Sequence, residues 1–419
     1  MRKLTVKNFS VIEDAELEFG KITVLIGPQA SGKSLMCKLA YFLGREVIEV
    51  AIERLVNRSE YSEFIAAVHR DFSKSFPPGG WGGASWSITF EAEEYSVTVS
   101  PLSTANGLSN VSVLFAESFR QAYSTRLNET VIEQQRTGFL PPVEGLRSLA
   151  ATRLFQLAGR GVWDSSTYIP LERSYFVDAK KGYRILGGEA DRLSARFANI
   201  LADSMNLDAP KHRVSKYLNG RIQLLLGQDD WSLVFLDGRF LPLSHLSSGS
   251  KELLPILSVL DFYENRRQAM GNQLISEELY GNRLYFFDDF TIEEPEASVF
   301  PQTQYELIQE LAALANEVHF NPHFTITTHS PYILSAFNDL IEAGRLGVDK
   351  ELRAEVSNIV EEKYWITPGD FKAYSIHDGK LESIMDPETG LINGEYLDAI
   401  SNKIGGDFDA LLRIGYAKS

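Results

Sequence analysis

Apolar and polar residues alternate along the start of the chain with the two-residue period of a β-strand. The alternation covers residues 4–9 and 15–19, and a nearly continuous apolar run follows at residues 21–26. Successive side chains of a strand point to opposite faces, so these patterns predict three strands before residue 27. Residues 86–90 and 95–99 alternate in the same way and predict a β-hairpin.

Beyond the third strand the pattern changes in places to a helical period. Helices are predicted at residues 40–68, 116–136 and 189–205, with a Gly- and Pro-rich loop at 77–83. Short strands are predicted at residues 221–226, 231–235 and 239–243. No heptad repeat is sustained between Ser34 and Leu246, which favours a compact insertion over a coiled-coil arm.

The composition is that of an ordinary globular protein, with 44% hydrophobic residues and a length that predicts roughly two to three domains. Polar residues interrupt the first segment, and no stretch approaches the length of a membrane-spanning helix. The single cysteine, Cys37, excludes an intramolecular disulfide and suits a reducing compartment. We therefore expect a cytoplasmic protein without membrane contact.

The formal net charge of −15 means that the molecule as a whole repels a nucleic-acid backbone. Any contact with nucleic acid must be local. The best basic segment is residues 211–216 with Arg221, backed by Lys180, Lys181 and Arg184. A charge run of this size is usually a solvated face.

Residues 27–34 form a complete G-x-x-x-x-G-K-S loop between a predicted strand and a predicted helix. Gly27 and Gly32 allow the tight turn that points backbone N–H groups at phosphate oxygens. We expect Lys33 to reach the β- and γ-phosphates and Ser34 to bind Mg²⁺, with ATP as the nucleotide. The predicted nucleotide-binding residues here are Gly27, Pro28, Gln29, Ala30, Ser31, Gly32, Lys33, Ser34 and Leu35.

A second motif, L-S-x-G-x-x-x-L, begins at Leu246 and opens an amphipathic helix. Alone, a serine at this place is commonly a helix N-cap. Beside a phosphate-binding loop, we interpret Ser247, Ser248 and Gly249 as a second nucleotide-binding element. Two such elements in one chain suggest half-sites that face each other across a dimer.

A β-rich apolar run from Leu284 contains two acid pairs, Asp288-Asp289 and Glu293-Glu294. Phosphoryl transfer to water needs one acid for the metal shell and a neighbour to orient and polarise the water. We favour the second pair, with Glu293 as metal ligand and Glu294 as general base. Asp288 is the alternative metal ligand.

Residues 324–328 predict a β-branched strand that delivers His329 at its carboxyl end, where ligands bind in doubly wound sheets. A lone histidine there is often structural. After the three preceding motifs we interpret it as a sensor of the γ-phosphate, so the predicted catalytic residues are Lys33, Glu294 and His329. The other histidines lack the spacing of a zinc site.

In this order, the motifs resemble those of the ABC-type ATPase heads of the SMC and RecF group. They are more closely similar to the OLD-type ATPases of bacterial antiphage defence, at residues 26–34, 168–173, 246–249, 292–297 and 328–331. The resemblance implies that Lys33, Ser247, the acid pair and His329 act together on ATP sandwiched between two subunits. Arg173, in an I-P-x-x-R element, either lies near the nucleotide or pairs with a neighbouring acid.

The resemblance also implies the fold: an α/β, ABC-type P-loop ATPase head with a mixed central sheet, an antiparallel β lobe, a compact, mainly helical insertion and no long coiled coil. We expect the head to comprise residues 1–45 and 220–345. A first insertion at 46–115 adds the hairpin, the helical insertion covers 116–219, and 346–419 form a C-terminal α/β extension.

OLD nucleases continue into a TOPRIM domain that binds metal through a glutamate and a D-x-D pair. After His329 the one D-x-D is Asp407 to Asp409, without the strand and glutamate that should precede it. We therefore expect no nuclease in this chain. The resemblance to the ATPase component of two-gene defence systems, including the PARIS type, implies a separately encoded TOPRIM effector and a phage trigger.

Three functions follow. The first is an oligomeric ATP-gated scaffold or sensor that controls an effector nuclease, and the alternative is a RecF-like ATPase that clamps DNA. The acidic charge balance favours the scaffold. An ABC transporter subunit is weaker, because such subunits are usually shorter and lack an insertion of this size.

Overall fold

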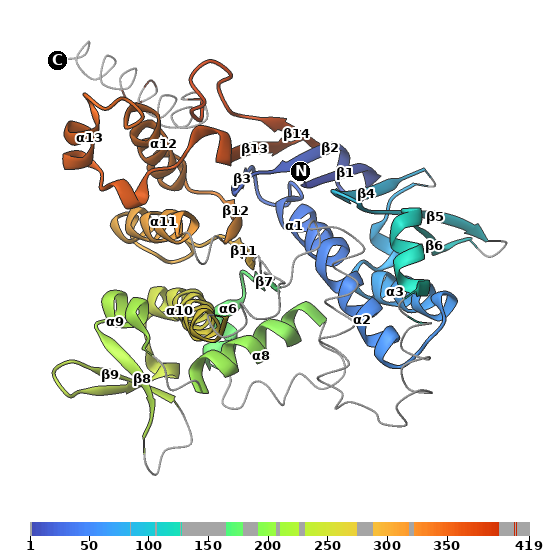
Figure 1. Cartoon of the computed structure of the whole chain (residues 1–419), viewed down its shortest axis with the longest axis horizontal. Helices are drawn as coiled ribbons and strands as arrows, with labels where there is room; N and C mark the ends of the chain where they lie inside the picture. The colour runs from blue at the N-terminus through green and yellow to red at the C-terminus, as the bar shows by residue number, and fades with distance from the viewer. Residues whose placement is uncertain are drawn as a thin grey trace, which may run out of the picture.

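The computed structural model describes residues 2–83, 85–104, 107–125, 127, 165–178, 192–206, 210–225, 231–274, 288–317, 322–393, 406 and 408. The strands of these residues form a mixed 11-stranded sheet, in the order β6-β5-β4-β1-β2-β14-β13-β3-β12-β11-β7, and a separate three-stranded sheet. Figure 1 shows the large sheet running through the middle of the molecule with helices on both sides. The predicted mixed α/β fold is confirmed.

One half of the large sheet is parallel. Its strands are β13 (Phe371–His377), β3 (Ile22–Ile26), β12 (His323–Thr328), β11 (Asp288–Glu293) and β7 (Ser165–Ile169). Because parallel strands end at the same edge, the residues that follow β3, β11 and β12 meet there. This edge carries the phosphate-binding loop, the acid pair and His329.

The other half is antiparallel, with strands β6 (Gly107–Phe115), β5 (Tyr95–Thr104), β4 (Ser87–Ala92), β1 (Arg2–Phe9) and β2 (Ile12–Phe19). β14 (Lys380–Ser383) joins the halves, antiparallel to β13 and parallel to β2. The predicted antiparallel lobe is therefore part of the central sheet. The same sheet includes β7, from the expected helical insertion at 116–219, and β13, from the expected extension at 346–419.

Two apolar cores cover opposite faces of the sheet. On β3, Ile22 and Val24 belong to one core and Leu25 to the other, as the two-residue period of a strand requires. The Leu25 side is covered by α1 (Lys33–Tyr41), a π-helix (Phe42–Glu46), α2 (Val47–Val56) and α3 (Tyr61–Ser75). The single predicted helix at 40–68 is thus broken, with a turn at residues 57–60.

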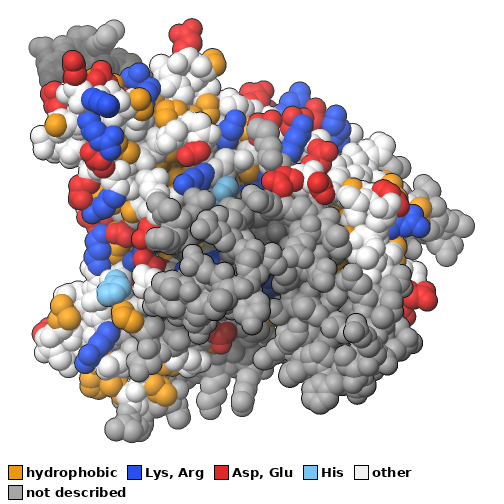
Figure 2. All heavy atoms as spheres, in the orientation of Figure 1, with side chains coloured by type: hydrophobic (Ala, Val, Ile, Leu, Met, Phe, Trp, Pro, Cys, Tyr) orange, Lys and Arg blue, Asp and Glu red, His pale blue; other side chains and the backbone are white. Residues whose placement is uncertain are grey.

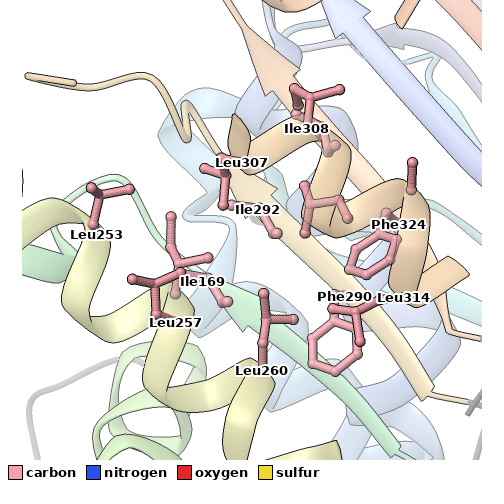
Figure 3. Packing of buried hydrophobic residues seen from close by; sticks show 14 of the residues in the cluster. Ile169, Leu253, Leu257, Leu260, Phe290, Ile292, Leu307, Ile308, Leu314 and Phe324 are labelled. Atoms are coloured by element: carbon pink, nitrogen blue, oxygen red, sulfur yellow. The ribbon is translucent and has the colours of Figure 1, made fainter. Parts of the chain in front are cut away.

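The other face is covered by α10 (Ser248–Leu274), α11 (Pro301–Asn316) and α12 (Pro331–Leu346). Figure 3 shows Leu253, Leu257 and Leu260 of α10 directed at the apolar side chains of β7 and β11. Their spacing of four and three residues places them on one helix face. α10, with 27 residues, is the longest helix in the described part of the chain, where no long coiled coil occurs.

Smaller elements surround this frame. They are the helices α6 (Arg173–Asp178), α8 (Arg192–Asn206), α9 (His212–Leu218) and α13 (Arg353–Ile359), and the small sheet of β8 (Gly220–Leu224), β9 (Trp231–Phe235) and β10 (Phe240–Pro242). Of the predicted helix at 116–136, residues 117–125 are helical and most of the rest lies outside the described residues, as do Lys180, Lys181, Arg184, Asp407 and Asp409. Among the described helices, none is long and apolar enough to cross a membrane.

Candidate functional site

The phosphate-binding loop connects β3 to α1 and depends on its two glycines. Gly32 has a φ of 105°, and a Cβ there would lie 2.5 Å from Ile12 Cδ1. A Cβ on Gly27 would lie 2.4 Å from the Ile376 carbonyl oxygen. Side chains are excluded at both ends of the loop, so the backbone itself lines the turn. Pro28, Gln29 and Ala30 are exposed, and Ser31, Ser34 and Leu35 are half-buried.

Lys33 is held inside the loop. Its Nζ donates to the carbonyl oxygens of Gly27 and Pro28, both at 2.8 Å, and only 5% of the residue is exposed. Burial lowers the pKa of Lys33, while the nearby carboxylates of Glu294 and Glu296 act to raise it. The ammonium therefore sits between the loop and the acid pair, where a phosphate would compete with the two carbonyls for its protons.

Glu293 ends β11 and is almost completely buried, at 2% exposure. Its Oε2 accepts the Leu171 N–H at 3.0 Å. Burial and the nearby Glu293 carboxylate raise the pKa of Tyr168, so the phenol hydroxyl is a neutral neighbour of this carboxylate. Burial and the negative charge of Glu293 together raise the pKa of the Cys37 thiol, which places the carboxylate beside α1. Ser34 lies in the first turn of the same helix.

A buried carboxylate oxygen beside the phosphate loop fits the predicted Mg²⁺. Glu293 and Ser34 would hold the ion, and it would supply positive charge to neutralise that of the phosphates. No group of three or more His, Cys, Asp or Glu side chains forms a metal site within the described ranges.

The alternative metal ligand, Asp288, does not reach this edge. It begins β11, at the opposite end of the strand from Glu293. The neighbouring Asp289 is buried and forms an ion pair with Arg2 at 3.2 Å, and Ser166 donates to it at 3.4 Å. The pattern of apolar residues followed by two acids was misleading because this pair starts the strand instead of ending it.

Glu294 and His329 lie in contact at the ends of neighbouring strands. His329 Nε2 is 3.1 Å from Glu294 Oε1, with about a quarter to a third of each side chain exposed (30% and 25%). Glu294 has a left-handed backbone, with a φ of 40°, and its N–H donates to the Thr327 carbonyl at 2.9 Å. The strained turn thus aims the carboxylate at the histidine while leaving both groups accessible.

Glu296 holds the histidine segment in place, and sequence reasoning missed this role. Its Oε1 accepts the His329 backbone N–H at 2.6 Å and the Thr328 hydroxyl at 2.7 Å. The one available signal is that a third acid follows the pair by two residues. Glu296 therefore joins the acid loop after β11 to the end of β12.

The predicted second nucleotide-binding element, Ser247 to Gly249, which we call the signature residues, lies at the start of α10. The Ser247 hydroxyl accepts the Ser250 N–H at 3.3 Å, so Ser247 acts as the N-cap. Ser247 and Ser248 are exposed and therefore accessible to a second molecule. A Cβ on Gly249 would lie 2.7 Å from the Ser298 carbonyl oxygen, so this glycine allows the helix to approach the loop that follows the acid pair.

Arg173, in the I-P-x-x-R element, has no exposed surface. Its Nε lies 3.1 Å from Glu252 Oε2, so the guanidinium pairs with a neighbouring acid. The ion pair with a neighbouring acid, which is one of the two alternatives that the sequence left open, is therefore present.

Two cations of the best basic segment form ion pairs with carboxylates. Arg213 is buried and lies 2.9 Å from Asp261 and 2.6 Å from Glu264, and Lys216 pairs with Glu310. On the face shown in Figure 2, Lys and Arg side chains are interspersed with Asp and Glu. Arg213 and Lys216 are therefore engaged by carboxylates, whereas Arg221 is exposed.

Part of the chain matches the model of one protein family. Residues 184–334 match the family model described as an AAA ATPase domain. The matched range includes Ser247, the acid pair and His329, and supports the interpretation of the chain as a P-loop ATPase. No curated protein sequence matches the chain significantly.

Solved structures of low similarity cover nearly the whole chain. The SMC head domain from Thermotoga maritima is 13% identical with a TM-score of 0.35, covering 91% of this chain and 97% of its own. An Smc head bound to the C-terminal domain of ScpA, derived from Pyrococcus furiosus, is 11% identical with a TM-score of 0.36, covering 92% and 96%. The recombination mediator protein RecF is 10% identical with a TM-score of 0.38, covering 91% and 97%.

Proposed function

We propose that this chain is an ABC-type ATPase of the SMC and RecF group that binds Mg²⁺-ATP and hydrolyses it in a site shared by two copies. The observation that carries the proposal is the edge of the parallel sheet. There, Lys33 follows β3, Glu293 ends β11 with Glu294 directly after it, and His329 follows β12. A cation, a buried metal ligand and an accessible acid with its histidine are the groups that phosphoryl transfer to water requires.

In this proposal each group has one role. Lys33 and the loop amides bind the β- and γ-phosphates, and Ser34 with Glu293 holds the metal. Glu294 orients and polarises the attacking water, and His329, 3.1 Å from its Oε1, fixes the carboxylate and senses the γ-phosphate. The exposed Ser247 and Ser248 would close on the nucleotide held by a second copy.

Two variants test the chemistry. Lys33→Ala should abolish ATP binding, whereas Glu294→Gln should preserve binding, slow hydrolysis by about 100-fold or more and accumulate the ATP-bound oligomer. Lys38→Ala changes an exposed lysine of the same helix and should leave binding unchanged. If Asp289→Asn trapped the ATP-bound oligomer and Glu294→Gln turned over normally, the assignment of the base would be wrong.

The cellular role that we propose is an oligomeric scaffold or sensor, which holds a separately encoded TOPRIM-type nuclease and releases it when a phage trigger is present. Two observations support a protein partner over direct DNA binding. The net charge is −15, and Arg213 and Lys216 of the best basic segment are engaged by carboxylates.

The RecF-like alternative makes the opposite prediction for the purified chain. A DNA clamp should bind duplex DNA with ATP in a filter-binding assay, and its affinity should fall steeply as salt is raised. The scaffold should show no such binding, and after co-expression it should co-purify with a TOPRIM nuclease encoded beside it. Tight, salt-sensitive DNA binding without a partner would favour the clamp.

A further inference from the structure

Arg173 links three separate segments around the acid pair. Its Nη1 donates to the Glu293 carbonyl oxygen at 2.6 Å, and its Nη2 donates to that of Glu294 at 2.9 Å. Its Nε donates to the Glu252 carbonyl oxygen at 2.9 Å and lies 3.1 Å from the Glu252 carboxylate. Nη1 also reaches the Pro170 carbonyl oxygen, at 3.2 Å.

The partners of Arg173 on α10 and in the acid pair have different roles in the proposed mechanism. Glu252 lies on α10, three residues after Gly249, so its position follows that of the signature residues. Glu293 and Glu294 carry the metal ligand and the base. Arg173 binds their main-chain oxygens, so it does not compete for the carboxylate oxygens that the proposal assigns to metal and water.

A second contact joins the same two segments. Gly249 packs so closely on Ser298 that a Cβ would lie 2.7 Å from its carbonyl oxygen. Figure 3 shows that α10 also packs its leucines against β7 and β11. Two contacts therefore hold the start of α10 against the loop after β11. Arg173 bridges them through its hydrogen bonds, and Gly249 packs directly on the backbone of Ser298. A shift of α10 is expected to move the acid loop.

We propose that Arg173 is a positioning residue that couples the two ATP sites of a dimer. The inference rests on the proposed function: α10 acts on the nucleotide of the second copy, and the acid pair acts on the chain's own nucleotide. Closure of Ser247 to Gly249 on one ATP would then set Glu294 at the other site. Hydrolysis should consequently be positively cooperative in ATP.

Arg173→Lys tests the coupling, because one ammonium cannot span Glu252 and both carbonyls. We expect kcat to fall by about tenfold or more and the Hill coefficient for ATP to fall towards one, while the dissociation constant for a fluorescent ATP analogue changes less than about threefold. Glu252→Gln, a nearly isosteric change at the α10 end, should lower the Hill coefficient with a smaller effect on kcat. Arg192→Lys, on α8, is the matched control and should change neither.

The outcomes separate the two proposals. A wild-type chain that fails to hydrolyse ATP, or hydrolyses it at full rate as a monomer, overturns the proposed function. A wild type that hydrolyses cooperatively, together with Arg173→Lys and Glu252→Gln proteins that keep its kcat and Hill coefficient, overturns the coupling alone. A merely structural role for Arg173 would lower ATP binding and kcat together with the folded fraction measured by circular dichroism, and this result would also overturn it.

Discussion

At the residue scale, the pair of Glu294 and His329 makes the most direct prediction. Their 3.1 Å contact fixes the carboxylate, so His329→Ala should reduce kcat by about 100-fold while ATP binding stays within about threefold. Phosphate release and titration with a fluorescent ATP analogue measure the two quantities. His212→Ala removes an exposed histidine on α9 and should behave like the wild type. Unchanged turnover in His329→Ala would remove the histidine from the mechanism.

His323, at the opposite edge of the sheet, should make the fold sensitive to acid. Burial, followed by the charges of Arg2 and Lys21, lowers its pKa to about 3. The folded chain keeps this histidine neutral, whereas the unfolded chain protonates it below about pH 6.5. The unfolded state therefore binds more protons between these values, and stability falls as pH falls from about 6.5 towards 3.

The expected loss from this group is up to about 2 kcal/mol between pH 7 and pH 5. Urea unfolding at the two pH values measures it, with His323→Gln as the comparison because glutamine does not titrate. The difference between the two proteins should shrink at pH 5. An equal loss of stability in both would show that His323 does not carry the effect.

How far the sequence predicts the site depends on which residues a local pattern fixes. Lys33, Glu293 and His329 follow predicted strands, so the parallel topology alone brings them to one edge. Glu296 and Arg173 act through main-chain atoms of residues distant in sequence. No local pattern encodes such partners, because they exist only once the strands are paired.

At the element scale, ion pairs hold α8 against the helices that follow the phosphate loop. Arg196 lies 3.4 Å from Glu46 and 3.3 Å from Glu49, and both glutamates are almost fully buried. Arg196→Ala should destabilise the fold by about 2–4 kcal/mol, because it leaves buried carboxylates without this partner. Arg353→Ala breaks an exposed pair with Glu362 and should cost much less. Urea denaturation measures the free energy of unfolding of both variants. An equal loss in the two would show that Arg196 does not stabilise the buried carboxylates as proposed.

Element boundaries were predicted least well where tertiary packing overrides the helical period. Before the turn at residues 57–60, the helical stretch passes through a π-helix at Gly44, where a Cβ would lie 3.0 Å from the Phe90 ring of β4. That contact is made with a strand more than forty residues away, so the helical pattern of residues 40–68 gives no sign of it. The hairpin at β4 and β5 was predicted because its alternation is local, and it pairs with β1 in the antiparallel lobe expected from residues 4–19 and 86–99.

At the scale of the whole molecule, the central sheet combines strands from segments far apart in the chain. Residues 371–383 pair with β3 and β2 in the middle of the sheet, although they come almost last in the chain. Sequence patterns detect strands but not the order in which they pair. The C-terminal strands therefore belong to the ATPase sheet, and a truncation before residue 371 should leave β3 without one of its two neighbours.

The shared site also predicts which surface closes in the oligomer. Phe300 lies at the start of α11, six residues after Glu294, and is 75% exposed. An exposed aromatic side chain in the segment that follows Glu294 would be buried if a second copy covered the proposed site. In a Glu294→Gln background, which should retain ATP, Phe300→Asp should weaken dimerisation by about tenfold or more, because closure would bury a charge.

Sedimentation equilibrium with Mg²⁺-ATP measures this effect, and ATP binding by the isolated chain should persist. Leu236→Asp is the matched control, since Leu236 is 77% exposed in the turn between β9 and β10. If both variants dimerised like the parent protein, the closing surface would have to lie away from Phe300. A loss of dimer only in Phe300→Asp would place the second copy over the edge that carries Lys33, Glu294 and His329, where the proposed chemistry needs it.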